Sequence, residues 1–188
     1  MKNPNRTVRI TGGRYRGRII RTPGNKTHPM GERERIALFN MITDWVRESS
    51  VADLYCGGGT LGIEALSRGA KSVVFIDRDA QAIATIIDNL KQLDIYKTIE
   101  PRSQESYSVL RADIVALTET ITSQYGAVIA DPPYDQYTEK MIERLPKLVL
   151  DGGILVLSHP NEPPELDKME LMKTRKYAAA HISVYVKK

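Results

Sequence analysis

Cysteine, aromatic side chains and long apolar runs are all scarce in this sequence. The one cysteine, Cys56, excludes an internal disulfide framework and a multi-cysteine zinc site, and the three histidines lie far apart, so we expect no metal. No run approaches the ~18 consecutive apolar residues of a transmembrane helix. Met1–Pro4 leads into charged residues and not into the apolar segment of a signal peptide. We therefore expect a cytoplasmic protein with no membrane partner.

Length and composition indicate one globular unit. The chain has 188 residues, and most domains contain roughly 100–200, so two large domains are excluded. Apolar residues make up 41% and charged residues 27%, which excludes a disordered acidic chain. We expect a monomer.

Positive charge is concentrated at the N-terminus. Residues 1–26 contain eight basic residues and no acidic one, whereas the whole chain has 27 Lys and Arg against 23 Asp and Glu, so the remainder is mildly acidic. This distribution is expected when a separate element binds a polyanion, and the alternative is a solubilising tail. We divide the chain into a basic arm, residues 1–26, and a main domain, residues 27–188.

The arm itself predicts a hairpin, and the main domain predicts alternating strands and helices. Val8–Thr11 and Arg18–Arg21 are short alternating runs around a glycine-rich turn, and helical spacing begins at Glu32 and extends to about Arg47. Further strands are predicted at 51–56, 72–77, 127–130 and 154–157, and helices at 61–67, 79–93, 115–123 and 137–149. The pattern of the stretch 98–115 is ambiguous, and we interpret it as a short strand followed by a polar loop.

This alternation predicts an α/β fold, a doubly wound and mostly parallel sheet with helices on both faces. Two alternating runs near 168–174 and 181–186 have no helix between them, so they should pair as a hairpin. That hairpin would bring a C-terminal antiparallel strand into the sheet.

The first motif with chemical content follows the first strand of this sheet. Asp53-Leu54-Tyr55-Cys56 runs into Gly57-Gly58-Gly59, where glycines let the backbone approach a ligand at the carboxyl end of a strand. Asp77 ends the next strand, in a position to accept hydrogen bonds from ribose hydroxyls. No Gly-Lys-Ser/Thr follows, which excludes a P-loop. Because Asp53 favours a cationic ligand, the motif indicates the amino and sulfonium groups of S-adenosylmethionine.

The second motif is Asp131-Pro132-Pro133-Tyr134, at the end of a later parallel strand. The prolines fix the backbone and present carbonyls, and an ionised carboxylate only accepts hydrogen bonds. This loop can therefore bind an exocyclic amine, and Tyr134 offers a ring on which a base can stack. The alternative is a simple Pro-Pro turn after a strand.

With both motifs, the sequence resembles the S-adenosylmethionine-dependent amino-group methyltransferases. A closer resemblance covers nearly the whole chain, and it is carried by Arg9–Gly13, Arg16–Arg18, Arg35–Asn40 and Leu61–Ala70. These segments are similar to the RsmD-type 16S ribosomal RNA guanine-N2 methyltransferases. The chain departs from the family at His28-Pro29-Met30, where Arg-Pro-Thr is usual, at Asp77, where Glu is common, and at Cys56–Gly59.

The resemblance implies a Rossmann-like methyltransferase fold and roles for single residues. Asp131, Pro132, Pro133 and Tyr134 would be catalytic, with Asp131 and the Pro132 carbonyl accepting the hydrogens of the guanine N2 amine. The cofactor S-adenosylmethionine would be bound by Asp53, Tyr55, Gly57, Gly59 and Asp77, and Asp113 and Ile114 would approach its adenine. Arg9, Arg14, Arg16 and Arg18 would bind 16S ribosomal RNA, free or in an assembling small subunit.

Three other functions are compatible with parts of this pattern. A protein glutamine methyltransferase also uses a Pro-Pro-Tyr loop, but it leaves the basic arm unexplained. A DNA adenine or cytosine amino-methyltransferase explains the arm, and only the whole-chain resemblance argues against it. A non-catalytic RNA-binding protein with this fold has no need of two intact motifs.

Overall fold

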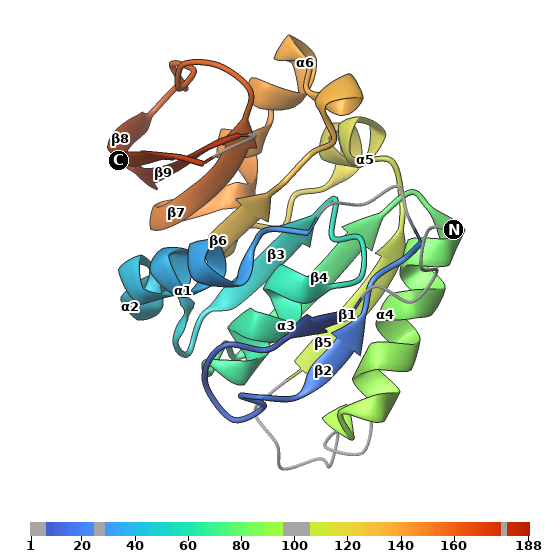
Figure 1. Cartoon of the computed structure of the whole chain (residues 1–188). Helices are drawn as coiled ribbons and strands as arrows, with labels where there is room; N and C mark the ends of the chain where they lie inside the picture. The colour runs from blue at the N-terminus through green and yellow to red at the C-terminus, as the bar shows by residue number, and fades with distance from the viewer. Residues whose placement is uncertain (1–6, 25–28, 96–105, 178–179) are drawn as a thin grey trace.

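The computed structural model describes residues 7–24, 29–95, 106–177 and 180–188, and a seven-stranded sheet forms its centre (Figure 1). The strand order is β5-β4-β3-β6-β7-β9-β8; the first five strands are parallel, and β9 is antiparallel to both β7 and β8. Their bounds are β3 (Ser50–Leu54), β4 (Ser72–Asp77), β5 (Ser106–Arg111), β6 (Tyr125–Ala130), β7 (Val149–His159), β8 (Met169–Lys176) and β9 (His181–Lys187). The predicted fold class, with its C-terminal antiparallel strand, is confirmed.

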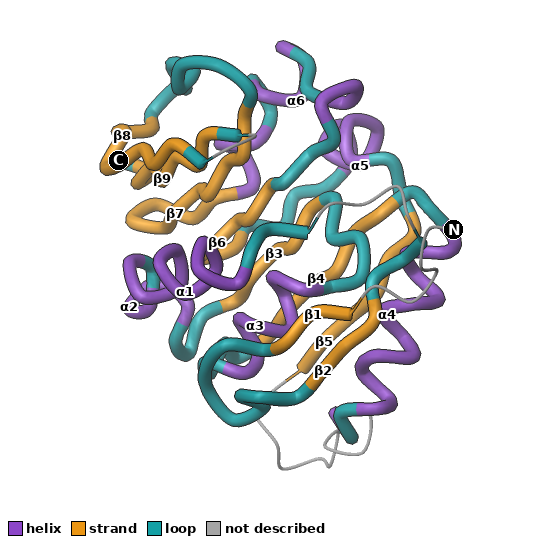
Figure 2. The backbone as a smooth tube through the Cα atoms, viewed as in Figure 1, coloured by secondary structure: helices purple, strands orange, loops and turns teal. Residues whose placement is uncertain are grey.

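Helices cover both faces of the sheet (Figure 2). Buried side chains of α1 (Glu32–Met41), α2 (Thr43–Val46), α3 (Thr60–Ser67) and α4 (Ala80–Gln92) form one core cluster, whose face we name the α1 face. The opposite cluster contains side chains of α5 (Ile114–Thr120) and α6 (Glu139–Ile142). Along β3, Val51 packs in the first cluster and Ala52 in the second, as expected for a strand buried on both sides.

The predicted N-terminal hairpin is present and packs against the domain. β1 (Thr7–Arg9) and β2 (Ile19–Arg21) are antiparallel, and Ile10 and Ile20 are fully buried. The Asn89 side chain of α4 accepts from Arg21 N and donates to Arg21 O, both at 2.9 Å. The hairpin is thus held to the helices by both core packing and buried hydrogen bonds. Residues 1–6, 25 and 26 of the predicted arm and residues 27 and 28 of the predicted main domain lie outside the described residues.

The helix predicted over 32–47 is interrupted. It ends at Met41, Ile42 has φ −104° and ψ 11°, and the short helix α2 follows. The Thr43 hydroxyl donates to the Phe39 carbonyl at 2.6 Å, and such side-chain bonds to the preceding turn bend helices.

The single helix predicted over 137–149 is wrong. The segment contains α6 and a separate 3-10 turn, η3 (Leu145–Leu148). Pro146 cannot donate a backbone hydrogen bond, and its ring would clash with the Ile142 carbonyl, so the α-helix ends at Ile142. Within the stretch left ambiguous, residues 98–105 are outside the described part, and β5 and α5 occupy the rest. None of the described helices is long and apolar enough to cross a membrane.

Candidate active site

The glycine loop connects β3 to α3 at the edge of the sheet where the parallel strands end, which we name the carboxyl edge. Gly57 and Gly59 have φ of +53° and +77°, conformations that side chains rarely allow. A Cβ on Gly58 would lie 2.8 Å from the Arg21 carbonyl oxygen, so the chain leaving β2 passes directly over the loop. Asn89 also donates to the Gly58 carbonyl at 2.9 Å. The loop is therefore fixed from two sides, and Gly57 is its most accessible glycine.

Asp53 is the buried carboxyl group of this site. It lies on β3 with 1% of its surface exposed, and its Oδ2 accepts the N–H of Gly62 at 2.8 Å. Burial raises its pKa from 3.8 to about 8; the Gly62 bond opposes this shift, and the charges of Asp131 and Asp77 add to it. A carboxylate in this position is stabilised by a cationic ligand, as the sequence pattern predicts for the amino and sulfonium groups of S-adenosylmethionine.

Asp77, at the end of β4, turns both oxygens toward backbone N–H groups. Its Oδ2 accepts from Gly57 and its Oδ1 from Asp79, both at 2.9 Å. Each oxygen keeps a lone pair for a further donor such as a ribose hydroxyl. The half-buried Tyr55 follows β3 in the same loop. Burial is the main cause that raises the pKa of its phenol to about 12; the charges of Asp113 and Asp77 add to the shift and Arg78 opposes it.

The residues expected near the adenine follow β5. Asp113 caps α5 by accepting from Ala116 N at 3.1 Å, and its Oδ2 lies 3.7 Å from Arg78 Nη1. Ile114 is buried. Asp53, Tyr55, Gly57, Asp77 and Asp113 are thus gathered at the carboxyl ends of three adjacent strands, while their predicted ligand contacts stay predictions.

The Asp131–Tyr134 loop follows β6, the strand next to β3 in the sheet. Asp131 is half-buried, Pro132 is buried, and Tyr134 is 55% exposed. Burial raises the pKa of the Asp131 carboxyl; a hydrogen bond from the Ser158 hydroxyl opposes the shift and the charge of Glu34 adds to it. An acceptor and an exposed ring therefore stand beside the glycine loop.

The four predicted RNA contacts are exposed, and three of them, Arg14, Arg16 and Arg18, lie away from the carboxyl edge. Arg14 N donates to the carbonyl of Ser67, the last residue of α3, and Arg18 Nη2 donates to the carbonyl of Gln92, the last residue of α4. These helices run away from the carboxyl edge, so the hairpin tip with Arg14 and Arg16 is at the opposite end of the domain (Figure 1). The structure does not bring these arginines to Asp131.

Three neighbours of the site were not found from the sequence. They are Ser158, which donates to Asp131, Glu34, whose charge acts on Asp131, and Arg78, which faces Asp113. Arg78 directly follows Asp77, which is a usable signal, whereas the other two depend on strand order and helix direction. Cys56 is buried, and burial raises the pKa of its thiol, which disfavours the nucleophilic thiolate. Among the described residues no cluster of His, Cys, Asp and Glu could hold a metal.

Comparison with known proteins finds named rRNA methyltransferases among the relatives of this chain. The chain is 29% identical over 188 residues to the Bacillus subtilis protein YlbH, and the match covers 96% of this chain and 100% of YlbH. The name of YlbH assigns it to the rRNA methyltransferases. It is 28% identical over 160 residues to ribosomal RNA small subunit methyltransferase D of Escherichia coli K12, covering 82% and 75% of the two chains. The solved structure of the Escherichia coli protein yhhF shares the fold, with a TM-score of 0.83 at 24% identity over 97% of this chain and 98% of yhhF. A family model described as "Conserved hypothetical protein 95" matches residues 8–186, and the chain belongs to that family.

Proposed function

We propose that the protein transfers a methyl group from S-adenosylmethionine to the exocyclic N2 amine of a guanine in 16S ribosomal RNA. The observation that carries the proposal is the position of the Asp131–Tyr134 loop directly beside the glycine loop, on adjacent strands of the sheet. The names of the relatives support ribosomal RNA as the substrate.

The residues at the glycine loop fit the cofactor. Asp53 is a buried carboxyl group whose ionised form a cationic ligand stabilises, Gly57 and Gly59 give the loop its left-handed turns, and Asp77 has acceptor capacity for hydroxyl groups. When bound there, S-adenosylmethionine supplies an electrophilic methyl group. These residues hold and orient it, with Asp113 and Ile114 at the adenine end.

The Asp131–Tyr134 loop binds and orients the target amine. The amine of guanine is a weak nucleophile because its lone pair is delocalised into the ring. Asp131 and the Pro132 carbonyl accept its two hydrogens, which orients the lone pair and stabilises the positive charge that develops on nitrogen. Ser158 holds the Asp131 carboxylate, and Tyr134, which is exposed, stacks against the base.

RNA contacts complete the proposal. Arg9, Arg14, Arg16 and Arg18 bind phosphates of the RNA at the hairpin, and the hairpin tip with Arg14 and Arg16 is distant from the reacting guanine. A ribosomal RNA segment is long enough to contact both ends of the domain. This arrangement gives the arginines a role in affinity and the Asp131 loop the role in chemistry.

The decisive experiment measures labelled methyl transfer to naked 16S RNA, small-subunit particles, DNA and protein extract. We expect transfer to RNA or the particle, and digestion to nucleosides should yield N2-methylguanosine. Asp131→Ala should reduce transfer by a factor of ~10²–10⁴ and leave cofactor binding, measured by calorimetry, within a few-fold. Label in DNA, in glutamine or in another nucleoside would contradict the proposal, as would no transfer at all with intact cofactor and RNA binding.

A further inference from the structure

Glu34 projects from the side of α1 that faces the sheet. Leu38 and Ile42 follow it at intervals of four residues and are 1% and 0% exposed, and residues at this spacing share one side of a helix. Glu34 is half-buried, and its Oε2 accepts the Gly31 N–H at 2.6 Å. That bond orients the carboxylate and leaves its other oxygen available to a further donor.

The direction of α1 places Glu34 at the carboxyl edge. At the opposite end of the α1–α2 segment, Trp45 Nε1 donates to the Gly152 carbonyl at 3.3 Å, and Gly152 lies near the beginning of β7. The segment therefore runs from the carboxyl edge to the edge where β7 begins, along the α1 face (Figure 1). Its first turn, with Glu34, is at the end of the sheet where the Asp131 loop follows β6.

The strand register places Asp131 on the same face. Ala130 pairs with Leu157, so Asp131 stands beside Ser158, and Ser158 pairs with Ile182, a member of the core cluster of the α1 face. Two strands away, Tyr177 also packs against that cluster. The charge of Glu34 reaches both neighbours, since it adds to the raised pKa values of Asp131 and Tyr177, for which burial is the main cause.

The helix direction and the strand register therefore put both carboxylates on the α1 face at the carboxyl edge, and the charge of Glu34 acts on Asp131. None of the ion pairs among the described residues includes Asp131 or Glu34. Such a pair is best satisfied by a ligand that presents several N–H donors side by side. Guanine does so, because its N1–H adjoins its N2 amine, whereas adenine and cytosine place a ring-nitrogen acceptor next to their amine.

We propose that Glu34 selects guanine by accepting the N1–H of the base whose N2 amine faces Asp131 and the Pro132 carbonyl. In a base with an acceptor at that ring position, the nitrogen lone pair would repel the Glu34 carboxylate. This inference rests on the proposed function, to which it adds the residue that discriminates the base. Asp131 and Pro132 alone would accept any exocyclic amine.

The test uses an RNA fragment that the wild-type protein methylates, with the modified guanine located by mass spectrometry. That guanine is then replaced by 2-aminopurine, which keeps the N2 amine but has an acceptor at N1. Wild type should methylate the guanine RNA with a kcat/KM about 10–100-fold higher, the loss expected for one hydrogen bond to a charged acceptor. Equal rates on the two RNAs would overturn the inference without any variant being needed.

The variant Glu34→Gln should reverse the preference between the guanine RNA and the 2-aminopurine RNA. The Gln carbonyl can keep the Gly31 bond and so preserve the start of α1, and its amide then directs an N–H₂ toward the base. That group opposes the N1–H of guanine and complements N1 of 2-aminopurine. The variant should lose activity on the guanine RNA and lose or reverse the preference for guanine.

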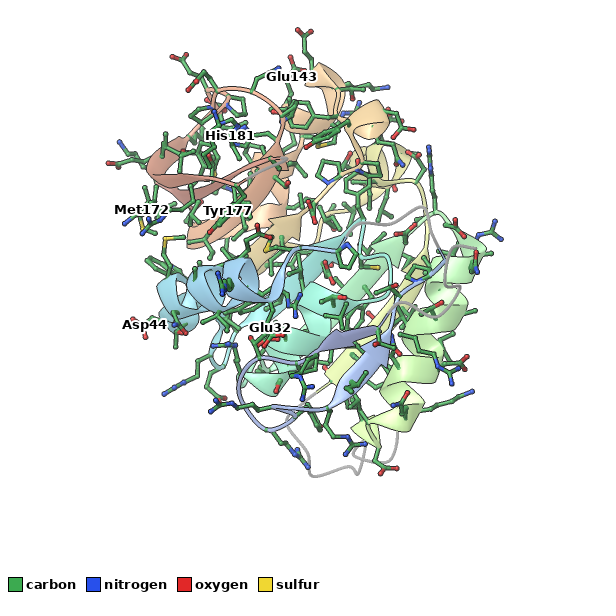
Figure 3. The ribbon with its side chains drawn as sticks, viewed as in Figure 1. Glu32, Asp44, Glu143, Met172, Tyr177 and His181 are labelled. Carbon is green, nitrogen blue, oxygen red and sulfur yellow. The ribbon has the colours of Figure 1, made fainter. Side chains whose placement is uncertain are left out.

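Glu32→Gln is the control, because Glu32 is an exposed acid of the same helical turn; in Figure 3 it and Tyr177 lie on opposite sides of the start of α1. It should retain wild-type rates and preference. If Glu34→Gln, shown folded by thermal melting, slowed both RNAs equally, Glu34 would act on the fold or on Asp131 and the inference would be wrong. If wild type methylated no RNA while binding cofactor, the proposed function itself would fail.

Discussion

Asp53→Asn should make the cofactor-free protein more stable and the cofactor site weaker. In the folded chain Asp53 keeps its proton up to about pH 8, whereas in the unfolded chain it loses the proton near its ordinary pKa of 3.8. Between these values the unfolded state binds fewer protons, so the free energy of unfolding of the wild type falls as pH rises. Asn does not titrate, and its carbonyl can still accept the Gly62 N–H, so the variant lacks this loss.

The size of the effect follows from the shift. From 3.8 to about 8, at 1.36 kcal/mol per pH unit, the cost of the buried carboxylate reaches about 6 kcal/mol above pH 8. The gain in the variant should therefore be about 2 kcal/mol at pH 5 and about 4 kcal/mol at pH 7. The dissociation constant for S-adenosylmethionine should rise by about 10–100-fold, because a charged partner of the cation is lost.

Urea unfolding at pH 5, 7 and 9 without cofactor measures the first effect, and calorimetric titration measures the second. Asp167→Asn, a substitution of an exposed aspartate, controls for the loss of one negative charge. A stability difference between variant and wild type that stays constant from pH 5 to pH 9 would refute the argument. It would show that the Asp53 carboxyl titrates normally in the folded protein.

Three further changes test other parts of the structure. Asp77→Ala should weaken cofactor binding by roughly 1.5–3 kcal/mol with a much smaller change of kcat at saturating cofactor; an unchanged dissociation constant in calorimetry would leave Asp77 as a strand-end cap only. Gly62→Ala should lower the free energy of urea unfolding by about 1–3 kcal/mol, because the added Cβ would overlap the Phe75 ring and lie 2.9 Å from Asp53 Oδ2, and wild-type stability would contradict this. Replacing Arg14, Arg16 and Arg18 with Ala should reduce RNA affinity but not cofactor affinity, and each lost phosphate contact should lower the magnitude of the salt slope by about 0.7–0.9. An unchanged slope in a salt series of RNA binding would identify the hairpin tip as a solvated surface.

Much of the fold could be predicted because its signals are local. The apolar run Ala127–Ala130 is long enough only for a buried strand, and the four-residue spacing of Ile86 and Leu90 places both on the buried side of α4. The two predicted helices that the structure interrupts, 32–47 and 137–149, also end for local reasons. Pro146 ends α6, and the Thr43 hydroxyl bends the chain after α1, so the sequence itself carries the signals that end both helices early.

The sequence by itself determined which groups the chain can offer, since both motifs end strands and a parallel sheet gathers strand ends at one edge. Only the tertiary structure decided what surrounds them. Ser158 reaches Asp131 because β7 pairs with β6, and the charge of Glu34 acts on Asp131 because α1 starts at the carboxyl edge. The arginine-bearing hairpin tip lies at the far end of α3. Strand order and helix direction come from packing between residues distant in sequence, and no local pattern of residues carries that information.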